Sequence, residues 1–320
     1  MQQLGDLMNK FKELLFLKNI KGLGNSKINK NYLYLLEEYS DLDDLISEIN
    51  YKFKTPLENL ETAKIKAEEL YEEILSNDEI NVITLFDDNY PEKLLVMGDK
   101  KPLTLYIKGN MDVLSKPNIA FIGTRKPSKL SEEFEENIVR AVLKTTDRVI
   151  VSGLALGCDK IAHQVTVDEN KQTIAVLPSG VNVIKPAKHK KLAQEIIETG
   201  GCLISEYEPN KTPYKKEYVE RDAIVAAFCD ATFVVECGVK SGTMHTVNFA
   251  NSYKRPIYAY LPDERPEGSY DGNEHIIENI ENSLMVENIE EFLDDLNSIG
   301  ISQKQNVDVS NNQSSLDNFF

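Results

Sequence analysis

The residues best suited to bind a ligand follow the apolar run that begins at Ile119. Gly123, Thr124 and Arg125 end this predicted strand, and an amphipathic helix is predicted after them. A strand that ends in glycine at a helix N-terminus leaves backbone N–H groups unpaired, with partial positive charge behind them, and this suits a phosphate. The planar guanidinium of Arg125 can bind two phosphate oxygens at once. The segment therefore predicts a phosphate site, although a glycine here can also form only a tight connection.

Two further turns have the same character, and a lysine cluster accompanies them. Residues 152–163 place glycines at another predicted helix start, and Ser241, Gly242 and Thr243 precede a third. The lysines of the cluster are Lys185, Lys188, Lys190 and Lys191. Taken alone, these lysines would be typical of a solvated helix face. Three such turns beside a lysine cluster predict a site for a polyanion.

These turns lie within a segment that alternates short β-branched runs with helical patterns. The predicted strands are residues 119–124, 148–153, 173–179, 202–206, 231–237 and 256–262. Strands that are apolar throughout cannot face water, so this βαβ alternation requires a parallel sheet covered on both faces. We predict an α/β fold with a Rossmann-like, doubly wound, mostly parallel sheet. Ligands of such sheets bind at the carboxyl ends of the strands, where all three turns fall.

The chain divides into three predicted parts. Residues 1–80 form a small helical module, in which Gly22 and Gly24 lie between amphipathic helices. This pattern is typical of a helix-hairpin-helix (SAM-like) module that offers N–H groups to a phosphate, or of an ordinary helix connection. Residues 81–298 hold an extended lead-in, the Rossmann-like core and one or two acidic helices. Residues 299–320 contain few core-forming residues, and we expect a disordered tail.

The net charge of −16 is unevenly distributed. Residues 31–80 hold fourteen acids and four lysines, and residues 281–320 hold eight acids and one lysine. The rest of the chain is close to neutral, so it can present a local basic face while the acidic flanks repel nonspecific polyanions.

The expected cellular compartment follows from the absence of a membrane-spanning run and of a recognisable signal peptide in the sequence. No apolar run reaches membrane-spanning length, and the first residues resemble neither a signal peptide nor an anchor, so we expect a cytoplasmic protein. The cysteines Cys158, Cys202, Cys229 and Cys237 show no paired spacing. We expect buried, reduced thiols, with neither a disulfide nor a zinc site.

Three segments carry a resemblance to a known family. IAFIGTRKPS (119–128), SGLALGCDKIAH (152–163) and VVECGVKSGTMHTVNFA (234–250) resemble motifs of the DNA-processing protein A (DprA/Smf) family. The resemblance extends over residues 10–298. It implies a protein that binds single-stranded DNA and helps to load RecA-type recombinases, without cofactor or metal, and that forms a homodimer through the late Rossmann elements. We expect no winged helix after the core.

The resemblance also implies roles for individual residues. Arg125, Lys188, Lys191 and Arg221 are expected to contact the DNA backbone. Main-chain or hydroxyl donors are expected from Gly123, Thr124, Ser241, Gly242 and Thr243. The chain departs from the family pattern where Asp222 and Ala223 follow Arg221, because family members carry Arg-Asn-Arg there, and where His189 replaces an asparagine. The first departure loses one cation and gains an acid.

An enzymatic alternative comes from the related nucleotide-cleaving phosphoribohydrolases. Their catalytic glutamate corresponds to Thr246, which cannot transfer a proton near neutral pH, although Glu206 and Glu236 end strands at the same edge. His163 and His245 are isolated histidines for which packing or capping is the simpler explanation. We therefore favour a binding protein over an enzyme. A nucleotide-sensing module that uses the same turns remains a third hypothesis.

The last eight residues have a pattern of their own. Gln313, Leu316, Phe319 and Phe320 read Q-x-x-L-x-x-F-F, which resembles the PCNA-interacting peptide that docks on sliding clamps. A short 3₁₀ turn would gather the three apolar side chains into one plug, with the glutamine at its rim. The alternatives are a chance run or a cap that folds back on the domain. The pattern predicts a possible sliding clamp as a partner.

Overall fold

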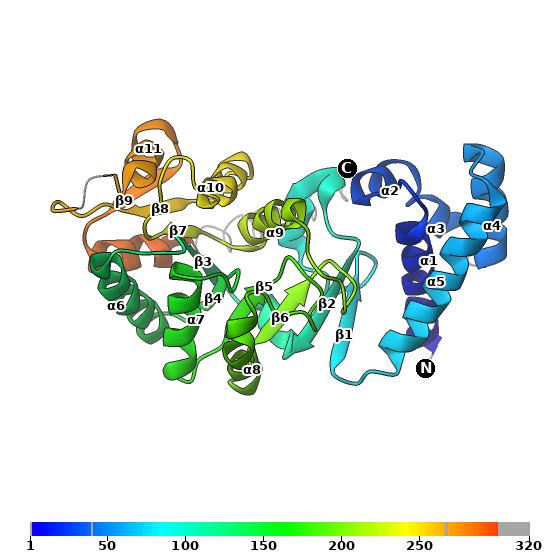
Figure 1. The fold of residues 1–320 in the computed structure, drawn as a ribbon, viewed down its shortest axis with the longest axis horizontal. Coiled ribbons are helices and arrows are strands. Elements are labelled where there is room, and N and C mark those ends of the chain that lie inside the picture. The colour runs from blue at the N-terminus through cyan, green and yellow to red at the C-terminus, as the bar shows by residue number, and fades with distance from the viewer. Residues whose placement is uncertain (1, 40, 266–267, 300–320) are drawn as a thin grey trace, which may run out of the picture.

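The computed structural model describes residues 2–39, 41–265 and 268–299. Gln313, Leu316, Phe319 and Phe320 of the clamp-like motif lie outside the described residues. Within the described residues, one nine-stranded sheet carries helices on both faces, and a group of N-terminal helices packs beside its first strands (Figure 1).

The sheet is mostly parallel. Its strands, in chain order, are β1 (Ile80–Thr84), β2 (Thr104–Gly109), β3 (Asn118–Ile122), β4 (Val149–Ser152), β5 (Thr173–Val176), β6 (Cys202–Ser205), β7 (Thr232–Val234), β8 (Ile257–Tyr260) and β9 (Ser283–Val286). In space the order is β1-β2-β6-β5-β4-β3-β7-β8-β9, and only the β1–β2 and β2–β6 pairs are antiparallel. The chain thus winds outward in both directions from β3, which confirms the predicted doubly wound α/β fold.

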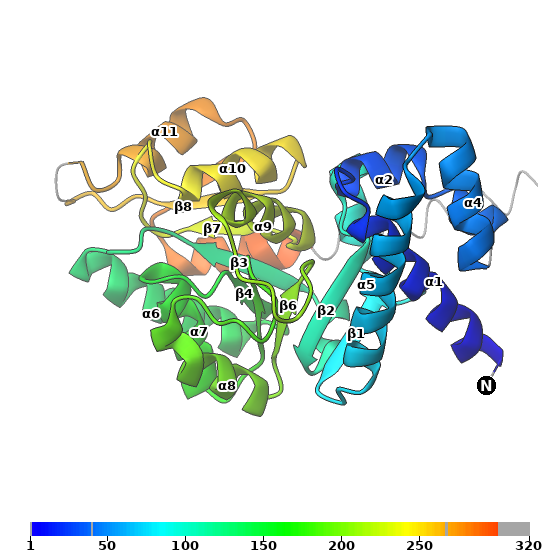
Figure 2. The ribbon, with the colours of Figure 1, turned by 45° about the vertical axis from the view of Figure 1, so that its right-hand side comes forward.

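Helices cover both faces of the sheet (Figures 1 and 2). One face carries α6 (Lys129–Thr145), α7 (Cys158–Asp168) and α8 (Lys190–Glu198). The other carries α9 (Lys215–Phe228), α10 (Thr243–Ser252) and α11 (Asp271–Asn279). Short 3₁₀ helices are η1 (Glu92–Lys100), η2 (Met111–Ser115) and η3 (Ala187–His189), and residues 289–299 are helical.

The alternation of side chains along a strand explains why both faces need cover. Along β3, Ile119 and Phe121 join the core with α6 and α7, whereas Ala120 and Ile122 join the core with α9 and α10. All six predicted strands are present. The sequence did not indicate β9, because this four-residue edge strand leaves Leu284 and Met285 about half exposed and lies between two acidic helices.

The N-terminal helices share a core with the sheet. They are α1 (Gln2–Asn19), α2 (Asn25–Asn31), α3 (Leu35–Glu38), α4 (Leu42–Phe53) and α5 (Leu57–Leu75). Leu14 of α1 lies in the same apolar cluster as Tyr106 of β2 and Leu177 after β5. Lys18 Nζ donates to Thr104 Oγ1 at 2.9 Å and to the carbonyl oxygen of Glu206 at 3.0 Å. These contacts attach the helices to the sheet near β2 and β6.

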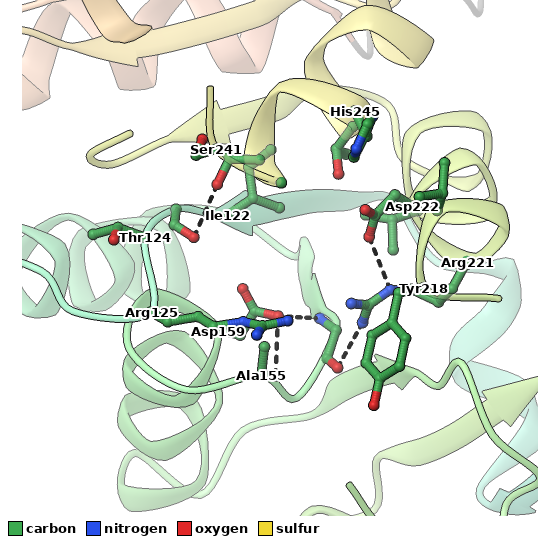
Figure 3. A pocket seen from close by; sticks show the side chains of 17 residues that line it. Ile122, Thr124, Arg125, Ala155, Asp159, Tyr218, Arg221, Asp222, Ser241 and His245 are labelled. Atoms are coloured by element: carbon green, nitrogen blue, oxygen red, sulfur yellow. Dashed lines mark hydrogen bonds and ion pairs between the residues drawn. The ribbon is translucent and has the colours of Figure 1, made fainter. Parts of the chain in front are cut away.

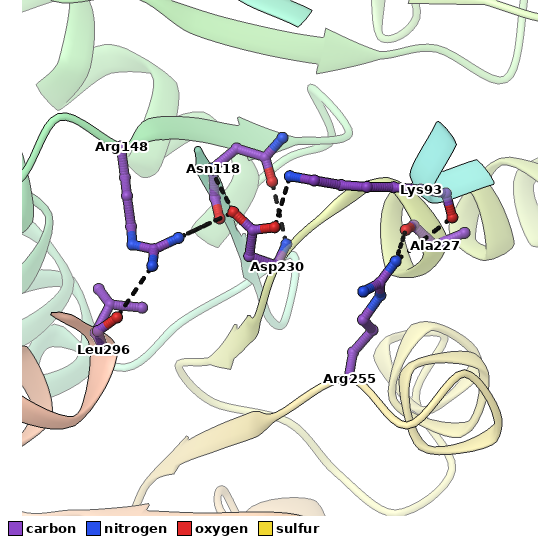
Figure 4. Close-up of polar contacts among 7 residues, drawn as sticks. All are labelled: Lys93, Asn118, Arg148, Ala227, Asp230, Arg255 and Leu296. Atoms are coloured by element: carbon purple, nitrogen blue, oxygen red, sulfur yellow. Dashed lines mark hydrogen bonds and ion pairs between the residues drawn. The ribbon is translucent and has the colours of Figure 1, made fainter. Parts of the chain in front are cut away.

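A buried polar network joins the amino ends of the central strands (Figure 4). The Asp230 carboxylate accepts hydrogen bonds from Asn118 N and Arg148 Nη1, each at 3.0 Å, and lies 2.6 Å from Lys93 Nζ. Arg148 Nη2 also donates to the carbonyl oxygen of Leu296 at 3.0 Å. The network therefore connects β3, β4, β7 and the helix at 289–299.

Two other expectations can be compared with the described residues. The four cysteines are buried, as predicted. In the part of the chain that the structure covers, no helix combines the length and apolar character needed to span a membrane.

Candidate functional site

A hollow of about 470 Å³ lies at the carboxyl ends of β3, β4 and β7 (Figure 3). It is placed where the winding of the sheet reverses, because β3 pairs with β4 on one side and with β7 on the other. Its walls come from the loops after these three strands and from one side of α9. The lining includes Gly123, Thr124, Arg125, Gly153, Asp159, Tyr218, Arg221, Asp222, Ser241, Gly242, Thr243, His245 and Thr246.

The loop after β3 approaches its neighbours too closely for any side chain at Gly123. A Cβ atom there would lie 2.4 Å from Cys158 Sγ. Thr124 N donates to the carbonyl oxygen of Glu236 at 2.7 Å, and Cys158 N donates to the Thr124 carbonyl at 3.2 Å. The Thr124 backbone N–H thus holds the loop in place and is already engaged within the protein.

Three polar side chains hold the loop after β4, namely Asp159, His189 and, from α9, Arg221. Asp159 Oδ2 accepts from the backbone N–H groups of Gly153 and Ala155, both at 3.1 Å. His189 donates from Nδ1 to the Leu154 carbonyl at 2.9 Å, and Leu154 adopts a positive φ of 59°. A non-glycine residue in this conformation requires support from its surroundings. The histidine that replaces the family asparagine therefore connects the lysine loop to the loop after β4.

Arg221 supports the same loop from α9. Its side chain is 7% exposed, and Nη1 donates to the carbonyl oxygens of Gly153 at 2.6 Å and Val176 at 3.0 Å. A Cβ atom at Gly153 would overlap this guanidinium, which explains the glycine. The Nη1 group thus donates its hydrogen bonds to backbone carbonyl oxygens. Arg221 therefore contributes to the hollow mainly through its positive charge.

The start of α10 closes the opposite wall. Thr243 Oγ1 donates to the Gly123 carbonyl at 3.0 Å, which joins the loops after β3 and β7. Gly242 is the N-cap residue, and no side chain caps the helix. The first backbone N–H groups of an α-helix have no partner within the helix, so this wall presents donors and partial positive charge.

The charged side chains of the hollow differ in their freedom. Arg125 is exposed, and within the described residues its guanidinium forms no hydrogen bond or ion pair. Asp222 Oδ1 accepts from Arg221 Nε at 3.0 Å, and its side chain is 16% exposed. Burial raises the pKa of Asp222, and the neighbouring Arg221 opposes this shift.

The predicted lysines lie outside this hollow. A smaller hollow of about 180 Å³ adjoins it, sharing Arg125, Tyr218 and Arg221, and is lined by Lys185. Lys188 and Lys191 are exposed on η3 and α8 and line neither hollow; Lys191 Nζ lies 2.8 Å from Glu195 Oε1. The structure therefore brings Arg125 and Lys185 to one rim, with the other lysines farther along the same loop.

The acids considered for catalysis are engaged elsewhere. Glu236 Oε2 accepts from Ser128 N at 2.8 Å and from Ser128 Oγ at 2.7 Å, which secures the start of α6. Glu206 lines a different hollow, beside α2, and its Oε2 accepts from Asn25 Nδ2 at 2.6 Å. Burial raises the pKa of Glu206 to about 7. Thr246 does line the hollow after β3, where the related hydrolases carry glutamate.

The isolated histidines separate into two kinds. His163 is fully buried, its Nδ1 lies 2.8 Å from Thr173 Oγ1, and burial lowers its pKa to about 3, so it stays neutral. His245 is exposed at the hollow. Across the described part of the chain, His, Cys, Asp and Glu side chains form no group of three that could hold a metal.

Tyr218 is the main lining residue that sequence reasoning missed. It is half-buried and lines both hollows beside Arg125. Two tyrosines flank two lysines in the segment TPYKKEYVERD (212–222), and aromatic and basic side chains that lie close together suit nucleic-acid contact. This grouping of aromatic and basic residues was the available signal.

Sequence comparisons with known proteins agree on one family. The family model for DNA recombination-mediator protein A matches residues 81–297. DNA processing protein DprA of Streptococcus pneumoniae is 34% identical over 195 residues, covering 61% of this chain and 67% of its own. Protein Smf of Borreliella burgdorferi is 28% identical over 270 residues, covering 80% and 81%.

Solved structures agree with the sequence comparison. The X-ray structure of DNA processing protein A from Streptococcus pneumoniae has a TM-score of 0.74 and 28% identity, covering 88% of this chain and 96% of that chain. DNA processing protein A from Helicobacter pylori has a TM-score of 0.61 and 29% identity, covering 70% and 98%, and was described for its single-stranded DNA binding mode.

Proposed function

The chain belongs to the DNA recombination-mediator protein A family, and on this premise we propose that it binds single-stranded DNA at the hollow after β3. The observation that carries the proposal is Arg125, an exposed guanidinium without a protein partner among the described residues. It stands at the rim that both hollows share, beside Lys185 and across from the uncapped start of α10. The single-stranded DNA binding of the Helicobacter pylori relative supports the same ligand.

The proposed contacts are with phosphates. Arg125 and the lysines of residues 185–191 would bind phosphate oxygens, and the α10 start would add backbone donors from Gly242 and Thr243. The other predicted groups, Gly123, Thr124, Ser241 and Arg221, would shape the hollow that these donors face. Binding should therefore weaken as salt increases and should tolerate most sequences.

The test measures the affinity for an oligothymidylate of about 15 nucleotides by fluorescence anisotropy. Arg125→Ala should weaken binding roughly tenfold, because it removes a charge-assisted contact. The double variant Lys188→Ala/Lys191→Ala should weaken it less. Lys144→Ala provides the control, because this exposed lysine lies in the last turn of α6, at the end remote from the hollow. Unchanged affinity in both Arg125→Ala and the lysine double variant would refute this site.

Hydrolysis of nucleotides is the alternative that the geometry disfavours. Thr246 lines the hollow in place of a glutamate, and Glu236 is held by Ser128. Incubation with nucleoside monophosphates should release no free base. Base release that Glu236→Gln abolishes would establish the enzymatic function instead.

We further propose that the bound strand is passed to a RecA-type recombinase, as the family relationship suggests. A protein that delivers the strand to the recombinase should shorten the lag in a strand-exchange assay. Arg125→Ala should restore the lag, and Lys144→Ala should not. An unaltered lag with the unsubstituted protein would contradict this role.

A further inference from the structure

The interior of the hollow differs in charge from its rim. Arg125 stands at the rim, whereas Asp159 and Asp222 line the interior together with Arg221. The Arg221–Asp222 ion pair, at 3.0 Å, cancels one of these charges, and Asp159 remains. A phosphate placed deep in the hollow would meet carboxylates, so phosphates are favoured only at the rim. The interior suits a group with hydrogen-bond donors and no negative charge.

Asp222 offers acceptors to such a group. Figure 3 shows its carboxylate facing the space between Ile122 and Arg221. Only Oδ1 has a partner within the described residues, the Nε of Arg221, and each carboxylate oxygen can accept more than one hydrogen bond. Ile122 and Val225 add apolar surface to the lining, and Tyr218 adds an aromatic ring. Apolar and aromatic surface beside an oriented polar group suits a partly polar ligand.

We propose that the hollow takes one base of the bound strand and that Asp222 reads its Watson–Crick edge, with guanine preferred. Guanine presents two adjacent donors, N1–H and N2–H, which match the two oxygens of a carboxylate. Adenine and cytosine present one amino group beside an acceptor nitrogen, and thymine presents one N–H between two carbonyls that a carboxylate repels. Tyr218 would contact the face of the base. This inference rests on the proposed function.

The preference is measured with oligothymidylates of about 15 nucleotides that carry one central substitution. A single guanine should tighten binding roughly tenfold over thymine, since a bidentate contact discriminates by about that factor. 7-Deazaguanine, which keeps the Watson–Crick edge, should retain the gain. N1-methylguanine, which lacks the N1–H donor, should lose it. A single adenine controls for stacking by a purine and should give a smaller gain.

Two variants of α9 assign the preference to one side chain. Asp222→Asn, of the same shape, replaces one acceptor by a donor and should lower the guanine-to-adenine affinity ratio to about one or below. Glu220→Gln is the control, because Glu220 lies two residues away and lines a different hollow. Its ratio should equal that of the unsubstituted protein.

The outcomes separate this inference from the proposed function. Equal affinity for all substituted oligonucleotides would overturn base reading and leave DNA binding intact. A guanine preference that persists in Asp222→Asn would overturn the assignment to Asp222. Failure to bind any oligonucleotide, or binding that ignores Arg125→Ala and the lysine double variant, would instead refute the proposed function.

Discussion

Removal of the Asp230 carboxylate should destabilise the fold more than any other single loss of charge at the amino ends of the strands. Asp230 is 5% exposed and accepts from Asn118 N and Arg148 Nη1 (Figure 4). The Arg148 side chain is 6% exposed, so Asp230→Ala would leave a buried guanidinium without its counter-charge. Such a loss costs about 3–5 kcal/mol. At about 2 °C per kcal/mol for a chain of this size, the melting temperature should fall by about 6–10 °C.

Calorimetry of the full chain measures this fall, and two variants show its origin. Asp147→Ala removes an exposed acid next to Arg148 in sequence and should leave the melting temperature unchanged. Arg148→Met/Asp230→Leu replaces the buried pair by apolar groups and should recover part of the loss, because no buried guanidinium is then left unpaired and Lys93, whose side chain is 29% exposed, can be hydrated. DNA binding well below the melting temperature should persist in Asp230→Ala, since the network lies at the opposite ends of the strands from the hollow. A fall of less than about 2 °C, or a double variant as unstable as the single ones combined, would refute the reasoning.

Three further predictions concern the module, the assembly and the tail. Burial raises the pKa of Glu206 from 4.5 to about 7, so this carboxyl group stabilises the fold at pH values below 4.5, and the stabilisation is lost as the pH rises through 7. The melting temperature should therefore fall less between about pH 5 and 8 in Glu206→Gln than in the unsubstituted protein. An unaltered dependence of the melting temperature on pH would contradict this. The family relationship suggests a homodimer, which light scattering should detect at micromolar concentration; a 36.2 kDa species alone, with and without DNA, would argue against it. Truncation after Asn312, or Phe319→Ala with Phe320→Ala, should abolish binding to the sliding clamp from the same source and leave DNA binding intact. If calorimetry detects no binding of the terminal peptide to that clamp, the clamp is not a partner.

The central sheet could be predicted from the sequence because the apolar pattern of each strand indicates which of its faces are buried. Strand β3 is apolar at every position after Asn118, and the structure buries all of them between two helical layers. Parallel strands joined by helices must present their carboxyl ends at one edge, so the turns after β3, β4 and β7 were expected to lie together. β9 could not be predicted in this way, because two of its four side chains, Leu284 and Met285, are about half exposed.

The contacts inside the hollow could not be predicted from the sequence, because they join segments that are far apart along the chain. Arg221 donates to carbonyl oxygens of residues 68 and 45 positions away, and nothing local to Arg221 indicates that its side chain is buried. The extra acid at Asp222 was visible as a departure from the family pattern, but its orientation toward the hollow depends on how α9 packs. Local patterns specify the periodicity of an element, whereas the loops that meet at its end follow from tertiary packing.

The small number of free cations at the site constrains how binding can work. Among the cations proposed to contact phosphates, Lys191 is paired with Glu195, whereas Arg125 and the exposed lysines at 185, 188 and 190 have no acidic partner in the described structure; Arg221 is paired with Asp222. Each phosphate contact on a single strand steepens the fall of log affinity with log salt by about 0.7, so these four cations together account for a slope of about −3. The net charge of −16 works against tighter electrostatic binding. A base held in the hollow would then supply the remaining affinity, and a much steeper measured slope would mean that cations elsewhere on the protein bind the strand.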